Sequence, residues 1–350
     1  MAAPTQSQPG SVDRPARPRP RAAFTPLFVG PGAVRKTLEQ TLWAESIGYE
    51  DVWLADAGNV DALTLAAVLL DRTERIRVGI AVSPVYTRTP AVFAASVATL
   101  ADIGPGRFVL GLGSGSETMV NGWHGLQLRK PLTHVRETVT LLRQMLAGEQ
   151  TAFEGEALRS DGYRQPPLPV NVPIFLAALR PRMIELAAAI ADGIILNLFP
   201  LRSLSRIMEM IRGALAQVGR ASGSLEVGTR LQVMVTDDID GARNLFRRLF
   251  GPYFTSPVYN SFLAWAGYET AAAEILDAGD VGDWRRVRAA LSDELVDEIA
   301  VIGTREQCQE RLFVLAEAGI QTPMLFCLSD DPDVQRATFA ALSPDQMSPK

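Results

Sequence analysis

Short apolar runs alternate along most of the chain with segments in which apolar residues recur at helical spacing. The runs are almost wholly apolar, which is typical of strands in a parallel sheet that is covered on both faces. They predict eight strands: residues 23–29, 51–55, 76–83, 107–112, 172–177, 193–197, 226–235 and 322–328. The third of these places Gly79 and Ala81 on the face opposite its larger side chains, a parity that suits a barrel strand.

The segments between the strands predict helices: residues 33–47, 61–70, 90–101, 131–146, 182–190, 201–218, 241–250 and 304–318. Eight strands that alternate with helices favour a (β/α)8 TIM barrel over an open sheet. Residues 252–300 are too long for one connection and predict an inserted helical segment. Residues 150–168 predict a hairpin or a loop excursion.

The domain organisation predicted from composition is simple. Residues 1–22 are rich in proline, serine and arginine and predict a disordered tail, whereas residues 23–350 predict a single barrel domain. The tail lacks the apolar segment of a signal peptide, and no run is long enough to cross a bilayer. We therefore expect a cytoplasmic protein with no membrane partner.

Charge and rare residues exclude several function classes. Lysine and arginine total 34 against 39 acidic residues, a net charge of −5, which argues against nucleic acid as the main partner. The two histidines, His124 and His134, are too few for a histidine-rich metal site, so no metal is expected. Cys308 and Cys327 are expected to be free, buried thiols.

The carboxyl ends of the predicted strands mark the expected site, because chemistry in a TIM barrel sits at that end. These ends are residues 55–57, 81–83, 113–117, 177–180 and 197–199. The third contains the turn that follows Gly106-Arg-Phe-Val-Leu-Gly-Leu-Gly113. A glycine fingerprint for a dinucleotide belongs to the first strand–turn–helix unit of a fold. Here the glycines close the fourth unit, which indicates a different way of holding a cofactor.

An ordered set of motifs spans residues 25 to 345, roughly the whole predicted domain. The motifs are AESIGYEDVW (44–53), IRVG (76–79), YTRTP (86–90), ATLAD (98–102), GRFVLGLG (106–113), ADG (191–193) and GTREQC (303–308). Together they resemble the bacterial luciferase-like flavin and deazaflavin oxidoreductases. The similarity is greatest to the branch that uses coenzyme F420 and includes methylenetetrahydromethanopterin reductase.

The resemblance implies a cofactor site at the strand ends. A non-prolyl cis peptide is implied at Ala81-Val82, where the cofactor ring bends over a bulge braced by Ala81, Val82 and Ser83. The turn that would contact the ring and its side chain consists of Ser114, Gly115, Ser116 and Glu117. The residues that would hold the phosphate are Ala177, Ala178, Leu179, Arg180 and Asn197. The family also implies a homodimer formed through barrel helices.

Two positions depart from the family pattern. Leu179-Arg180 replaces a Gly-Gly or Gln-Gly pair, so that Arg180 either supplies a cation for phosphate or weakens binding by its bulk. Asp56-Ala57 replaces an Asp-His pair, which removes one proton donor or ring contact. The remaining candidate acids are Glu117, Asp56 and His124, and each has an alternative role. Glu117 is otherwise a solvated loop carboxylate, and Asp56 a support for the neighbouring backbone. His124 otherwise makes a hydrogen bond within its loop.

Six aromatic residues within residues 253–268 are interpreted either as a lid over the site or as the core of the insertion. The function expected from the resemblance is F420-dependent hydride transfer to or from a small organic substrate, with reduction of a C=N or C=C bond favoured. The alternatives are an FMN-dependent monooxygenase on the same scaffold and a barrel that binds a flavin without catalysis.

Overall fold

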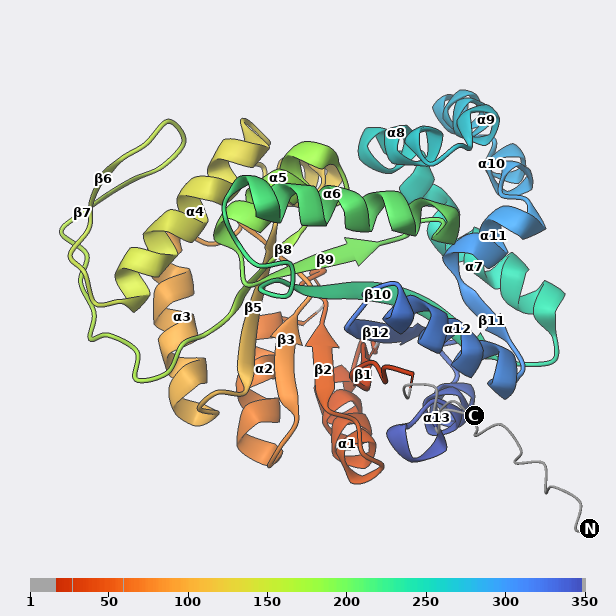
Figure 1. Ribbon diagram of the computed structural model, residues 1–350, viewed down its shortest axis with the longest axis horizontal. Coiled ribbons are helices and arrows are strands. Elements are labelled where there is room, and N and C mark those ends of the chain that lie inside the picture. The colour runs from red at the N-terminus through yellow and green to blue at the C-terminus, as the bar shows by residue number, and fades with distance from the viewer. Residues whose placement is uncertain (1–16, 27, 59, 348–350) are drawn as a thin grey trace, which may run out of the picture.

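Parallel strands pair side by side until the sheet closes on itself (Figure 1). The structure, a computed structural model, describes residues 17–26, 28–58 and 60–347. Eight strands of the larger sheet form the ring, in which β10 pairs with both β9 and β12. In order around the ring they are β1 (Ala23–Phe24), β2 (Asp51–Leu54), β3 (Arg77–Ile80), β5 (Phe108–Gly113), β8 (Ile174–Ala177), β9 (Gly193–Asn197), β10 (Glu226–Val235) and β12 (Thr322–Cys327). The predicted TIM barrel is confirmed.

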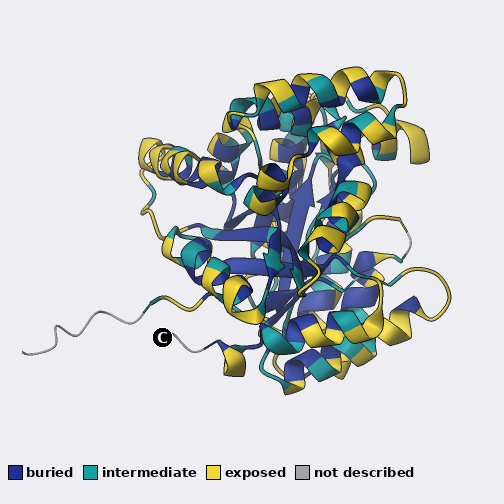
Figure 2. Cartoon of the chain, turned by 90° about the vertical axis from the view of Figure 1, so that its right-hand side faces the viewer, coloured by how far each residue is buried: buried dark blue, intermediate teal, exposed yellow. Residues whose placement is uncertain are grey.

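Helices surround the barrel with exposed faces turned outward, while the strands are buried (Figure 2). They are α1 (Ala33–Ser46), α2 (Ala62–Arg72), α3 (Pro90–Ile103), α4 (Pro131–Leu146), α5 (Pro181–Ile190), α6 (Leu204–Gln217), α7 (Ile239–Phe254), α12 (Arg305–Glu317) and α13 (Pro332–Ala341). Local signals explain several starts. Thr89 caps α3 ahead of Pro90, and Thr304 forms a capping box with Gln307 at α12. The last helix, α13, was not predicted.

The predicted inserted segment is confirmed as helical. It contains α8 (Pro257–Trp265), α9 (Glu269–Asp280), α10 (Trp284–Ala290) and α11 (Asp293–Ile299). A short strand that the sequence did not predict, β11 (Val301–Gly303), follows and pairs with β10 outside the ring. The excursion after α4 is a hairpin of β6 (Ala152–Glu154) and β7 (Arg159–Asp161).

The amino-terminal part of the domain differs from expectation in two ways. The first strand is shorter than residues 23–29 and ends at Phe24. Residues 17–22, assigned to the tail from composition, lie against the barrel: Arg17 forms ion pairs with Glu310 and Glu317 of α12. Residues 1–16 lie outside the described part of the chain.

Large side chains fill the barrel interior where glycines leave room for them. Trp53, Val109, Phe175, Ile195 and Met324 pack together in one layer. A Cβ at Gly79 would lie 2.3 Å from the Trp53 ring, and one at Gly193 would lie 2.5 Å from the Phe175 ring. Both positions therefore admit only glycine while those rings stay in place.

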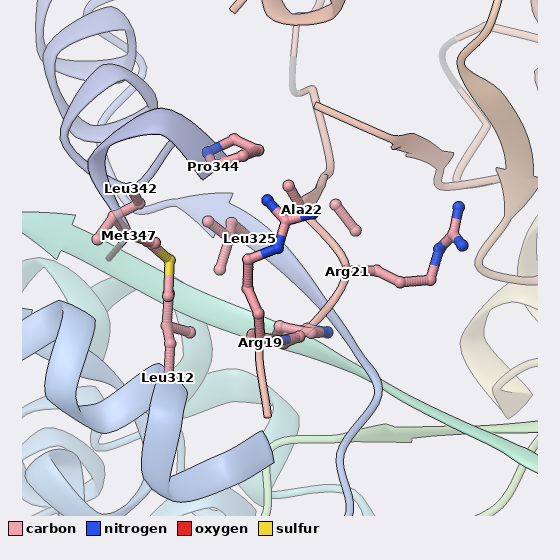
Figure 3. A pocket seen from close by; sticks show the side chains of 11 residues that line it. Arg19, Arg21, Ala22, Leu312, Leu325, Leu342, Pro344 and Met347 are labelled. Atoms are coloured by element: carbon pink, nitrogen blue, oxygen red, sulfur yellow. The ribbon is translucent and has the colours of Figure 1, made fainter. Parts of the chain in front are cut away.

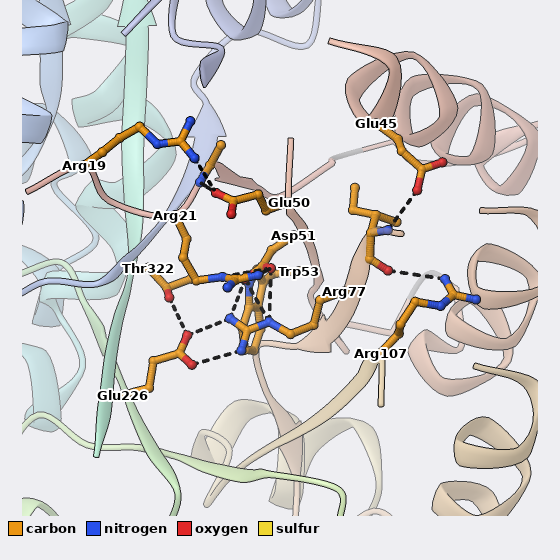
Figure 4. A network of polar contacts seen from close by, with 12 residues as sticks. Arg19, Arg21, Glu45, Glu50, Asp51, Trp53, Arg77, Arg107, Glu226 and Thr322 are labelled. Atoms are coloured by element: carbon orange, nitrogen blue, oxygen red, sulfur yellow. Dashed lines mark hydrogen bonds and ion pairs between the residues drawn. The ribbon is translucent and has the colours of Figure 1, made fainter. Parts of the chain in front are cut away.

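A charged network closes the amino-terminal end of the barrel (Figure 4). Asp51 is fully buried and accepts hydrogen bonds from Arg21 at 2.7 Å and from Arg77 at 2.5 Å. The same Arg77 donates to Glu226 at 2.6 Å, and the Thr322 hydroxyl donates to Glu226 as well. Each buried charge in this network is thus paired, as burial in a medium of low dielectric constant requires.

Two further observations concern the described residues. Cys308 and Cys327 are free and buried, as predicted. Within the described part of the chain, none of the helices has the length and apolar character needed to cross a bilayer.

We predict that Asp51→Asn destabilises the protein, because the amide keeps the shape of the carboxylate but leaves Arg21 and Arg77 without its charge. The expected loss is about 3 kcal/mol of the free energy of unfolding, measured by urea denaturation. Glu154→Gln is the matched control, since its pair with Arg159 is exposed on the hairpin and should contribute almost nothing. An unchanged midpoint for Asp51→Asn would contradict this role of the network.

The network also predicts acid sensitivity. Burial raises the pKa of Glu226, but hydrogen bonds and charge from Arg77 outweigh it, so that the pKa lies below its usual value of 4.5. A carboxyl with a depressed folded pKa contributes stability above its unfolded pKa, and this contribution is lost as the pH falls through the folded pKa. Unfolding free energy should therefore fall as the pH drops below about 4.5, the unfolded pKa of the carboxyl.

The control for this measurement is a pair of variants. Glu226→Gln should be less stable at neutral pH and should flatten the acid slope, whereas Glu154→Gln should keep the wild-type slope. A wild-type slope in Glu226→Gln would show that other carboxyls cause the acid sensitivity.

Candidate active site

The carboxyl ends of the barrel strands meet on one side of the molecule, where the insertion packs against them. Leu198, which follows β9, and Phe326 and Leu328 at the end of β12 share a buried cluster with Phe250 and Phe254 of α7. The insertion is therefore joined through apolar contacts to the part of the barrel where chemistry is expected. The helices α8 and α9 lie beyond these strand ends (Figure 1).

The strand β3 is interrupted by a bulge before the chain pairs again with β5 as β4 (Ser83–Pro84). The Ala81-Val82 peptide bond in this bulge is cis, as predicted. A Cβ at Gly111 would lie 1.8 Å from the Ile80 carbonyl oxygen, and one at Gly113 would lie 2.8 Å from Val82. The two glycines thus let the bulge lie directly against β5.

The same bulge brings several predicted residues together in one shelf. A Cβ at Gly113 would also lie 3.3 Å from the Ala177 side chain on β8. Ala81 and Val82 are half-buried and pack on the interior layer of the barrel. Small side chains from β3, β5 and β8 therefore form a surface on which a flat group can rest.

Asp56 is held by an ion pair. Its carboxylate accepts a hydrogen bond from Ser83 Oγ at 2.5 Å and one from Arg88 at 2.6 Å, and Arg88 also pairs with Asp61. Ser83 is fully buried, and its hydroxyl is directed to Asp56 and closed to solvent. This arrangement fastens the loop after β2 to the bulge, which is the supporting role considered for Asp56.

The glycine-rich turn after β5 is more exposed than expected. Gly115 has a φ of +71°, a left-handed conformation that suits glycine. Ser114 is half-buried, whereas Ser116 and Glu117 are exposed. Glu117 is thus a solvated loop carboxylate in this structure, the alternative considered for it, because the chain turns outward there into a π-helical turn, Thr118–Trp123.

His124 follows that turn and is exposed. The neighbouring Trp123 lies beside the loop after β2, since a Cβ at Gly58 would be 3.3 Å from its ring. The turn thus reaches across the strand ends from β5 to β2. The other histidine, His134, stacks on Tyr86 with ring centroids 4.0 Å apart, and burial lowers its pKa.

The predicted phosphate loop leads from β8 into α5. Ala178 is buried and its amide donates to the Ile195 carbonyl, while Leu179 packs partly against the main core. Arg180 is exposed immediately before Pro181, the first residue of α5. The exposed cation therefore stands at a helix amino terminus, where anions are favoured.

Asn197 lies across the strand ends from the bulge and connects β9 to the insertion. Its Nδ2 donates to the Tyr259 hydroxyl at 2.9 Å, and its Oδ1 accepts from Gln232 at 3.2 Å. Both polar groups of its amide are thus engaged by protein partners.

Sequence reasoning missed three polar residues inside the same end of the barrel: Thr25, Arg230 and Gln232. Each has a buried side-chain atom without a hydrogen-bond partner: Thr25 Oγ1, Arg230 Nε and Gln232 Oε1. The signal that could have found two of them is parity, because Arg230 and Gln232 are polar residues two positions apart, on the same face of a long strand.

The aromatic residues of 253–268 divide between the two interpretations. Phe254 is buried in the cluster of the insertion, and Phe262 stacks on Trp265 with centroids 5.2 Å apart. Tyr259 instead reaches Asn197. The segment thus supplies both core and one residue of the candidate site.

Two hollows lie away from the strand ends. A crevice of about 10 Å³ next to Arg19, Leu325 and Met347 has room for about one water molecule (Figure 3). A hollow of about 810 Å³ lies between α7 and α10 and is lined by arginines that include Arg248 and Arg288. Among the residues described, no group of three or more histidine, cysteine or acidic side chains is placed to hold a metal ion.

Known proteins resemble the chain in sequence and in fold. It is 28% identical over 283 residues to 5,10-methylenetetrahydromethanopterin reductase of Archaeoglobus fulgidus. The alignment covers 79% of this chain and 85% of the relative. The structure of the coenzyme F420-dependent tetrahydromethanopterin reductase of Methanopyrus kandleri superimposes with a TM-score of 0.79 at 20% identity, over 93% of this chain and 98% of that one.

A flavin enzyme shares the fold as well. A type II Baeyer–Villiger monooxygenase of Pseudomonas putida in complex with FMN superimposes with a TM-score of 0.69 at 18% identity, over 94% of this chain and 98% of that one. The family model for luciferase-like monooxygenases matches residues 14–322, which is most of the chain. The protein therefore belongs to the luciferase-like monooxygenase family.

Proposed function

We propose that the protein is an F420-dependent oxidoreductase that transfers a hydride between the deazaflavin and a small organic substrate. Reduction of a C=N or C=C bond is the favoured direction. The observation that carries the proposal is the shelf formed by the Ala81-Val82 bulge against Gly113 and Ala177. The similarity to F420-dependent reductases in sequence and fold supports the same assignment.

The described residues fit a flat tricyclic ring. Ala81, Val82, Gly113 and Ala177 have short side chains or none, so that the shelf itself carries no bulky group. Asp56 and Ser83 would position the bulge from behind through their hydrogen bond. When bound, the deazaflavin would supply the hydride chemistry, and the protein would supply position and exclusion of water.

The rest of the cofactor would lie toward β8 and the turn after β5. Arg180 and the amino terminus of α5 are suited to a phosphate, because an exposed arginine directly precedes the first turn of the helix. Ser114 and Ser116 carry hydroxyls along the turn that reaches toward Trp123. This placement makes Arg180 a phosphate ligand in the position where the family pattern has a small residue.

Proton delivery is proposed for Glu117 or His124. Asp56 is already bound to Arg88 and Ser83, so that transfer of a proton from it would require those contacts to break. Glu117 and His124 are exposed on the turn that spans the strand ends. Binding of a substrate beneath that turn would bring either side chain close to the reacting atoms.

An FMN-dependent monooxygenase is the second candidate, favoured by the FMN complex that shares this fold. A flavin-binding barrel without catalysis is the third, and its support is the alanine that follows Asp56 in place of histidine. We also propose a cytoplasmic homodimer, on the basis of the family resemblance alone.

Cofactor preference is the direct test. Titration of the cofactor-free, full-length protein with F420 and with FMN, followed by fluorescence, should give micromolar or tighter binding of F420 and much weaker binding of FMN. Preference for FMN would favour the monooxygenase. Binding of neither cofactor would contradict both enzyme assignments.

The shelf predicts a specific steric effect. Gly113→Ala places a methyl group 2.8 Å from Val82 and should displace the bulge, weakening F420 binding about tenfold or more. The double variant Gly113→Ala/Val82→Ala removes the clash and should recover part of the affinity.

The matched control is Gly122→Ala, because a Cβ at Gly122 meets nothing within 4 Å. It should bind F420 as the wild type does. Equal affinity of Gly113→Ala and wild type would show that the ring does not rest on this shelf.

A further inference from the structure

Arg230 lies inside the barrel near the carboxyl ends of the strands. Its partners in the parallel ladders are Asn197 on β9 and Met324 on β12. Met324 belongs to the interior layer, and residues paired across parallel strands point to the same face of the sheet. The Arg230 side chain therefore projects inward, and its guanidinium lies over the Phe326 ring at 4.3 Å from the centroid.

This cation has no anionic partner within the described residues. Its Nε is buried without a hydrogen bond, and the nearby side chains that raise its pKa are the neutral phenols of Tyr253 and Tyr259. Burial lowers its pKa, although an arginine in a protein stays protonated. The Arg230 side chain is half-buried, and a charge that is largely withdrawn from water without a partner is costly; an anion bound beside it would offset that cost.

The opposite end of the same barrel shows how this chain treats buried arginine elsewhere. There Arg77 donates to Asp51 and to Glu226, so that its charge is fully compensated. Both arginines lie within or against the barrel interior, but only the one at the amino-terminal end has carboxylates beside it. The missing carboxylate at Arg230 therefore points to an anion that comes from outside the chain.

Two unpartnered polar atoms lie at the same level of the barrel. Gln232 is in register with Phe326, and Thr25 continues β1 beside β12, where its amide donates to the Leu325 carbonyl. Thr25 Oγ1 and Gln232 Oε1 are both buried without partners. Two neighbours of β12 thus carry unused hydrogen-bonding groups at this level of the barrel: β10, through Arg230 and Gln232, and the residue that continues β1, Thr25.

We propose that Arg230, with Thr25 and Gln232, forms an anion-binding subsite for a carboxylate or another oxyanion of the substrate. The proposal rests on the assignment of this end of the barrel as the active site. An oxyanion would accept from the Arg230 guanidinium and from the Thr25 hydroxyl. The Gln232 carbonyl would accept from an N–H or O–H of the same substrate.

The position of the subsite favours the substrate over the cofactor as the source of the anion. The proposed phosphate ligand, Arg180, follows β8, whereas Arg230 is on β10, with β9 between them. The shelf for the ring is formed by β3, β5 and β8. Arg230 therefore faces the proposed ring site from the other half of the barrel, where a substrate would lie.

Small anions serve as probes because the substrate is not identified. Thermal unfolding of the full-length, cofactor-free protein is measured with acetate or inorganic phosphate in place of chloride at constant ionic strength. Acetate should raise the unfolding midpoint of the wild type in a saturable way, since a ligand that binds only the native state stabilises it. Arg230→Met should need at least about tenfold more acetate for the same rise.

Two further variants sharpen the result. Arg230→Lys keeps the charge without the planar fork and should respond between wild type and Arg230→Met. Arg336→Met is the matched control, because Arg336 also stacks on an aromatic ring, that of Trp43, but on the exposed surface. It should respond as wild type does. A wild type without a saturable response, or Arg230→Met with a wild-type response, would overturn the proposal.

F420 titration of the same variants separates the sources of the anion. Unchanged F420 affinity in Arg230→Met, together with loss of the acetate response, supports a substrate subsite. A parallel loss of F420 affinity would assign the cation to the cofactor phosphate and overturn the substrate assignment. If the wild type binds no F420 but keeps an acetate response that depends on Arg230, the anion subsite stands and the proposed cofactor is wrong.

Discussion

The carboxyl end of the barrel depends on how closely β3 approaches β5. The Ile80 carbonyl oxygen occupies the space in which a side chain at position 111 would begin, and Val82 does the same for position 113. Glycine at both positions lets the bulge between β3 and β4 lie flat against its neighbour. The bulge in turn determines where Ala81 and Val82 meet Ala177, and where Ser83 meets Asp56. The close approach of the bulge to β5 therefore positions residues from several strands and loops.

The two ends of the barrel treat charge in opposite ways. At the amino-terminal end, Asp51 and Glu226 compensate Arg77, and the closed network stabilises the fold without leaving groups for a ligand. At the carboxyl end, Arg230 has an aromatic ring beneath it but no carboxylate, and polar atoms around it are unpaired. The difference follows the general division of TIM barrels into a stabilising end and a functional end. The same residue type thus supports structure at one end and is available for chemistry at the other.

Most of the fold could be predicted from the sequence because parallel strands buried on both faces leave a strong pattern of apolar runs between helical segments. The pattern also located the strand ends, and the resemblance added the cis peptide at Ala81-Val82, which is present. For Glu117 the sequence left two interpretations open, a catalytic acid and a solvated loop carboxylate, because a glycine turn carries no information about the direction in which it leaves the strand. The contacts of Arg17 with α12 were missed since they join residues about 300 positions apart.

Arg230 shows most clearly why part of the site escapes sequence reasoning. A single arginine in a strand is compatible with an exposed edge, an ion pair or a buried site, and only the registers with Asn197 and Met324 decide among them. The same holds for Asp56, whose place at a strand end suggested catalysis until the structure showed Arg88 and Ser83 bound to it. The Asp56 carboxylate, which has a guanidinium partner, supports the structure of the site. The Arg230 guanidinium, which has no carboxylate partner, is available to bind an anion. The distribution of partners, more than the residue types themselves, separates the groups that hold this site from those that are free to bind.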